Sequence, residues 1–158
     1  MSHKSLVFKL FKFEEGDYIQ QLVLKSDNVK LDRAIGLTLL DFIVEHSTSE
    51  KEDASFEELL QKVEHGEYQP QDPRFADWDM NAKQIWLCPP VALPGHMAIT
   101  NEYTEYSIDP DSGGEPQQFT FNQYRTVLKF WRECQQMVEG KDLSTMEDFR
   151  REMPFPEK

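Results

Sequence analysis

The sequence predicts an α+β protein in which a small, mainly antiparallel sheet packs against three to four helices. Two patterns point to this fold class. Several short segments rich in aromatic and β-branched residues have strand-like patterns. Three longer segments carry apolar residues three or four positions apart, as an amphipathic helix requires. A third observation is the length of 158 residues, which suits a single domain over 1–158 with a substantial core.

The N-terminal part predicts a β-hairpin. Ser5–Phe13 alternates imperfectly between apolar and polar residues, which is typical of a strand with a bulge or of one covered on both faces. Glu14–Asp17 contains Gly16 and forms the turn. Tyr18–Leu24 is a second apolar run and completes the hairpin.

The next segment, Leu31–His46, has helical spacing and enough apolar residues to be largely buried. Gly36 weakens a helix there by about 1 kcal/mol. A buried strand over Ile35–Val44 is the competing interpretation, but the length of the run favours the helix.

A polar, acidic linker is expected over Ser47–Ala54. Ser55 and Glu58 then have capping-box spacing, so we expect a short helix from there to about Glu64.

A proline-containing loop is expected over Tyr68–Asn81. Phe75 and Trp78 within it invite a binding role, but packing beneath the loop is the favoured interpretation.

The second half alternates strand and helix signals. Gln84–Cys88 predicts a short strand that ends at two prolines, and the alternation in Met97–Ile108 predicts another. Asp109–Gln118 predicts a turn-rich acidic loop. Ser144 and Glu147 have capping-box spacing and predict a short last helix to about residue 152.

The clearest single element is the helix expected over Phe119–Val138. Thr120 and Gln123 have capping-box spacing, and Gly140 is a natural stop. Its apolar face is interpreted as core packing rather than as a ligand site. That face consists of Phe121, Tyr124, Val127, Leu128, Trp131, Cys134 and Val138.

The net charge of −12 is concentrated in two blocks, residues 31–67 and 84–118. The second block contains five acidic residues and no lysine or arginine. Nucleic acid and anionic membrane surfaces are therefore disfavoured partners, since both bind basic patches. A basic protein partner fits better, although negative charge that serves only solubility is the alternative.

Residues for catalysis or metal binding are sparse. The four histidines are isolated from one another, and Cys88 and Cys134 form no C-x-x-C pair, so we expect no metal and no cofactor. Lys9 and Lys12 interrupt the N-terminal apolar patch, so no signal peptide is expected. A cytoplasmic protein is the default expectation from cysteine usage.

One stretch resembles a known class of protein. A strand at 97–108 is followed by Phe119-Thr120-Phe121-Asn122-Gln123-Tyr124 and then Leu128-Lys129-Phe130-Trp131. Over about residues 97–138 this is similar to the closing part of immunity proteins from bacterial polymorphic toxin and contact-dependent inhibition systems. The resemblance implies a cytoplasmic, non-enzymatic protein that neutralises a cognate toxin by binding it. Toxins of this kind are often basic nucleases, which suits an acidic surface.

The leading hypothesis is therefore an acidic binding protein that docks on a basic partner. Tyrosines suit interface anchors, and acidic neighbours would set the association rate and specificity. The candidate partner-binding residues are Glu102, Tyr103, Glu105, Tyr106, Asp109, Asp111 and Glu115.

Two other functions remain open from the sequence. One is an enzyme that uses Cys88 and His96 as a nucleophile and base, if the proline-rich turn between them brings them together. The other is a DNA mimic that presents spaced carboxylates to a DNA-binding enzyme.

Overall fold

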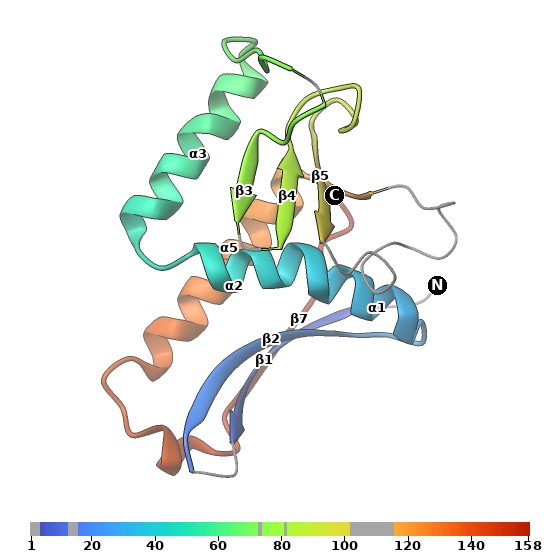
Figure 1. Cartoon of the computed structure of the whole chain (residues 1–158). Helices are drawn as coiled ribbons and strands as arrows, with labels where there is room; N and C mark the ends of the chain where they lie inside the picture. Colours follow the sequence, from blue (N-terminus) through green and yellow to red (C-terminus); the bar gives the residue numbers. More distant parts are fainter. Residues whose placement is uncertain (1–3, 13–15, 73, 81, 102–115) are drawn as a thin grey trace.

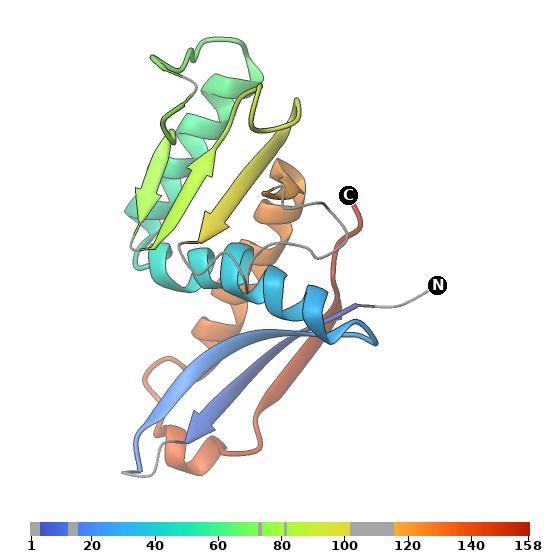
Figure 2. The same cartoon turned by 45° about the vertical axis from the view of Figure 1, so that its right-hand side comes forward.

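Two antiparallel sheets are joined by a layer of helices in the computed structural model of the chain (Figure 1). The structure describes residues 4–12, 16–72, 74–80, 82–101 and 116–158. The three-stranded sheet has the order β2-β1-β7, and the four-stranded sheet has the order β3-β4-β5-β6. The predicted α+β class is confirmed, with two sheets in place of the single sheet that was expected. Figure 2 shows the same layers after a 45° turn.

The three-stranded sheet contains the predicted hairpin. β1 (Ser5–Lys12) pairs along its length with β2 (Tyr18–Lys25). The other edge of β1 pairs with β7 (Arg150–Pro154), where Leu6 lies opposite Met153. The C-terminal segment therefore returns to the N-terminal strand.

The short last helix predicted from Ser144 to residue 152 is wrong. Asp142, not Ser144, caps a single 3₁₀ turn, η2 (Leu143–Met146), and the chain then extends into β7. The reason is long-range: the second edge of β1 offers backbone partners that a local capping pattern does not reveal.

The four-stranded sheet is a meander of short strands, β3 (Trp78–Met80), β4 (Lys83–Trp86), β5 (His96–Asn101) and β6 (Gln117–Thr120). β3 lies inside the segment predicted as a loop, and β6 begins within the predicted acidic loop, so both boundaries were wrong. The part of the predicted 97–108 strand beyond residue 101 lies outside the described residues.

The predicted helix after the hairpin is confirmed, but it is not uniform. It consists of α1 (Val29–Ile35), a π-helical turn η1 (Gly36–Leu40) and α2 (Asp41–His46). The hydroxyl of Thr38 donates to the carbonyl of Ala34 at 2.8 Å, so the widened turn keeps this carbonyl hydrogen-bonded.

The second helix, α3 (Glu50–Glu64), begins earlier than predicted. Ser49 caps it by accepting from the N–H of Glu52 at 3.2 Å. The Ser47–Ala54 linker prediction is therefore wrong for most of its length. Both Ser49 and Ser55 precede an acidic residue at capping-box spacing, and the earlier serine, which adds a further turn of helix, forms the cap.

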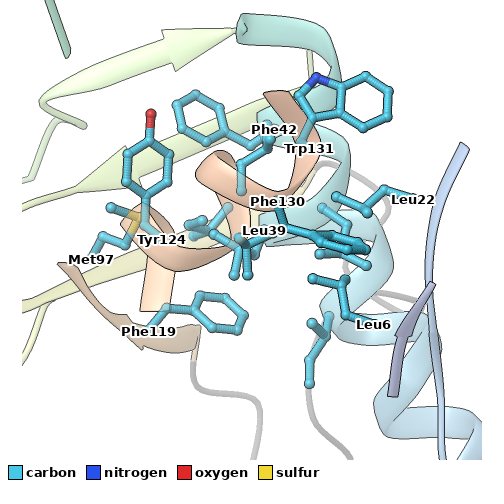
Figure 3. Close-up of a cluster of buried hydrophobic side chains, with 14 of the residues drawn as sticks. Leu6, Leu22, Leu39, Phe42, Met97, Phe119, Tyr124, Phe130 and Trp131 are labelled. Carbon is cyan, nitrogen blue, oxygen red and sulfur yellow. The ribbon is translucent and has the colours of Figure 1, made fainter. Parts of the chain in front are cut away.

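The predicted C-terminal helix is confirmed as α5 (Phe121–Val138), with both hydrogen bonds of the Thr120–Gln123 capping box present. Phe130 is buried, whereas Leu128 is only partly buried, so the apolar face is rotated slightly from the prediction. Figure 3 shows Tyr124 and Met97 towards the four-stranded sheet, and Leu6 and Leu22 towards the hairpin. α5 thus connects the two sheets through one core, in which each large apolar side chain contributes about 1.5–3 kcal/mol.

Removal of the α5 cap is expected to destabilise the fold. Thr120→Ala removes the hydroxyl that accepts from the Gln123 N–H at 3.0 Å, and the free energy of unfolding should fall by about 0.5–2 kcal/mol in urea titrations. Thr126→Ala makes the same change inside the helix and should be close to neutral. Equal losses from the two variants would contradict a capping role.

Candidate functional site

The acidic residues predicted to bind a partner, from Glu102 to Glu115, lie outside the described residues. The structure does place both ends of the segment that contains them. Asn101 is the last residue of β5, and its side-chain amide donates to the carbonyl of Leu37 at 3.0 Å. Gln117, just after the segment, pairs with Ile99 of β5. The described residues that flank the segment therefore lie at one end of the β5–β6 pair, beside η1.

Five of the ten acidic residues in the first block, residues 31–67, pair with bases from elsewhere in the chain. Arg125 of α5 donates through Nε and Nη2 to both oxygens of Glu57, each at 2.8 Å. Its Nη2 also donates to Glu64 at 2.6 Å. Arg132 donates to Asp53 at 2.6 Å. These pairs hold α3 along α5, so much of the charge on α3 has a structural role.

A further base matches the acids of α2. Lys83 of β4 is 3% exposed, and its Nζ lies 2.8 Å from Glu45 and 3.8 Å from Asp41. Burial raises the pKa of Asp41, and the neighbouring Lys83 charge works against that shift. The ammonium group therefore ties α2 to the four-stranded sheet.

The second acidic block, residues 84–118, has no lysine or arginine of its own. All five of its acidic residues fall within 102–115. Half of the acidic residues in the first block thus hold elements together, and the second block, whose acidic residues lie outside the described residues, stays the candidate interaction segment.

The geometry gives little support to an enzyme that uses Cys88 as nucleophile and His96 as base. Burial and the nearby Asp77 carboxylate raise the pKa of the Cys88 thiol, which disfavours the thiolate that a nucleophile requires. His96 places Nδ1 2.9 Å from the carbonyl of Pro94, and the described hydrogen bonds include none between Cys88 and His96. Burial raises the pKa of Cys134 to about 11. Among the described residues no cluster of His, Cys, Asp and Glu could hold a metal ion.

Phe75 and Trp78, the two aromatic residues considered for binding in 68–81, lie in different environments. Trp78 packs edge-on against His46 and Phe56, with ring centroids 5.3 Å apart in both cases, as the packing interpretation predicted. The packing interpretation is wrong for Phe75, which is 69% exposed and lies against Arg74. His46 in turn stacks on Phe42 at 5.1 Å. The cluster around His46 is therefore core, and Phe75 is an exposed aromatic residue outside it.

A groove beside the N-terminal hairpin was not predicted from the sequence. The groove has a volume of about 710 Å³ and lies between β2 and the α1–η1–α2 helix. Its strand wall is Ile19–Ser26, and its helix wall includes Val29, Gly36, Leu37 and Val44. The sequence contains two weak indications of this groove. Residues 18–24 contain no charge and no proline, and Gly36 gives the facing helix a position without a side chain.

A second, more polar hollow of about 480 Å³ lies between Gln20 of β2, the start of α3 and the end of α5. The Arg132–Asp53 pair forms part of its wall. Because this pair joins α3 to α5, we interpret the hollow as a product of helix packing.

Comparisons of the chain with models of protein families, with curated proteins and with solved structures found no match. In the part of the chain that the structure describes, no helix has the length and apolar character needed to cross a membrane.

Removal of the Arg125 guanidinium should loosen α3 from α5. For Arg125→Gln we expect a loss of about 1–3 kcal/mol in unfolding free energy at pH 7. Hydrogen bonding to Arg125 lowers the pKa of Glu64, so its stabilisation is present above the ordinary value of 4.5 and is lost as the pH falls through the lower folded value. The difference between variant and wild type should therefore shrink in acid.

The matched control is Lys62→Gln, because the Lys62–Glu58 pair is exposed and 3.6 Å apart. It should cost less than about 0.5 kcal/mol. A loss of stability in Arg125→Gln no larger than that in Lys62→Gln, or one that does not change with pH, would contradict the role of Arg125 in holding α3 against α5.

Stability should also fall with His46 protonation. Burial lowers the pKa of His46, so the folded state takes up a proton less readily than the unfolded state below the ordinary value of 6.5. The unfolding free energy should decrease as the pH falls below that value, and His46→Gln should make the dependence shallower between pH ~7.5 and ~5. His65→Gln changes an exposed histidine and is the matched control. The same slope in all three proteins would exclude His46 as its source.

Proposed function

We propose that the chain is a non-enzymatic binding protein that neutralises a basic protein partner by direct binding, in the manner of an immunity protein acting on its toxin. The observation that carries the proposal is the distribution of charge along the sequence. The five acidic residues of 102–115 have no lysine or arginine within 84–118, whereas Arg125, Arg132 and Lys83 bind acids of α2 and α3. An acidic segment without a base in its own sequence suits electrostatic docking.

The proposal also draws on the chemistry of the remaining residues. The raised pKa of Cys88 works against nucleophilic catalysis, and the described histidines form no metal-binding cluster. The proposed partner is a basic protein, with a nuclease toxin as one example, rather than nucleic acid or a membrane. On this proposal the protein acts in the cytoplasm, where such a toxin would reach its target.

The proposal predicts a salt-dependent complex with a toxin encoded beside this chain. Reversal of the charges in Glu102→Lys, Glu105→Lys and Asp109→Lys together should weaken binding by about 100-fold or more in calorimetry at low salt. Raising the salt should weaken wild-type binding and narrow the gap between wild type and variant, because ions screen exposed charges.

The control reverses three exposed acids in the C-terminal third, Glu133→Lys, Glu147→Lys and Glu157→Lys. It has the same net charge as the test variant and should bind within a few-fold of wild type. Equal losses in the two variants would mean that only total charge matters. Binding that ignores both salt and the first triple change would refute the acidic segment as the docking surface.

A further inference from the structure

The outer edge of β2 is the most open strand edge in the described part of the molecule. β2 is an end strand of its sheet and has eight residues, and it pairs with β1 on one side only. In an antiparallel pair, alternate residues direct their N–H and C=O groups away from the partner strand. The backbone hydrogen bonds of the described residues include none that joins this outer edge to another segment. A row of backbone donors and acceptors therefore faces the groove.

The other strand edges are protected in familiar ways. β7, at the opposite side of the same sheet, carries Arg150, Arg151, Glu152 and Pro154, and charge and proline both discourage further pairing. β3 has only three residues. β6 has four, and the Gln118 side chain in it bonds the loop at Val91 and Leu93. β2 has no proline, and lysine at its last position is its single charge.

The groove beside β2 has the size and lining for a peptide segment. Its volume of about 710 Å³ falls within the usual range for ligand sites, about 300–1,000 Å³. Val23, Val29, Leu37 and Val44 give it an apolar lining. Figures 1 and 2 show α1 next to the end of β2, and the helix and the strand diverging towards the start of β2. A partner strand would thus have both a backbone edge and an apolar wall.

Charged residues of both signs line the groove. Lys25 at the end of β2 and Arg33 of α1 are basic, and Asp32 of α1 and Asp41 of α2 are acidic. The Asp41 side chain is 47% exposed although it lies 3.8 Å from Lys83. A segment that carries both acidic and basic residues would complement this lining.

We infer that this groove binds an extended segment of a protein partner, which adds to the sheet as a further strand beside β2. Main-chain hydrogen bonds to the β2 edge would supply the pairing, and apolar side chains at alternate positions would face the helix wall. The occupant is a peptide segment of mixed charge. This inference does not depend on the acidic 102–115 segment, because no residue of that segment lines the groove.

Gly36 offers a direct test. It lies on the helix wall with φ of −59°, and an added Cβ would meet no atom within 4 Å. Gly36→Phe should therefore fill the groove from the helix side. Gly36→Ala is the matched control, because it makes the same backbone change and leaves most of the space open. Circular dichroism and thermal unfolding would establish that both variants fold.

The probe is a displayed library of peptides of about eight residues, the length of β2, with alternating apolar and polar positions. Wild type and Gly36→Ala should enrich the same peptides. Gly36→Phe should bind them at least about tenfold more weakly. In hydrogen–deuterium exchange, a selected peptide should slow exchange in β2. Methylation of alternate backbone nitrogens in that peptide should abolish its binding to the wild type.

The methylated peptide keeps the test decisive if Gly36→Phe does not fold. Equal binding of methylated and unmethylated peptides would overturn strand addition. So would equal binding by Gly36→Phe and Gly36→Ala, protection confined to other elements, or a library that yields no binder. A wild-type dimer in sedimentation, with β2 already protected and the dimer broken by Gly36→Phe, would make a second copy the occupant and would also overturn the inference.

Discussion

The apolar face of α5 is the constraint on which the rest of the structure depends. Each sheet is small, with three strands in one and four in the other, and must bury its apolar face against another layer. Phe8 of β1 packs against Trp131 at a centroid distance of 5.6 Å, and Phe56 of α3 packs against Tyr124 at 5.2 Å. One helix thus supplies the second layer for both the hairpin and α3, and the two halves share a continuous set of buried side chains.

Ion pairs on the same helix complement this apolar contact. Arg125 and Arg132 reach the acids of α3 from positions seven apart, which places them on one side of α5. The helix therefore presents an apolar face to the core and a basic edge to its acidic neighbour. This arrangement explains how a strongly acidic protein keeps the acidic helix α3 close to the core.

The parts of the fold that depend on local pattern could be predicted from the sequence. The hairpin, the 31–46 helix and α5 have strong periodicity, and α5 also has a capping box that the structure contains in full. β7 could not be predicted, because Arg150–Pro154 is a strand only through pairing with β1. The start of α3 was ambiguous because Ser49 and Ser55 both carry cap signals. The predicted acidic site lies outside the described residues, and the groove along β2 depends on which strand lies at the edge, which local pattern does not fix.

The pairing of β1 with β7 has a consequence for synthesis of the chain. Val7 of β1 and Glu152 of β7 lie opposite each other. One edge of β1 therefore stays unpaired until β7, which is synthesised much later, has left the ribosome. Until then β1 can pair only with β2, and the Trp131 side chain that covers Phe8 is also missing. The third strand of this sheet can therefore join only after β7 has been synthesised, and until then the hairpin exposes apolar surface and an unpaired strand edge of the kind that favours aggregation.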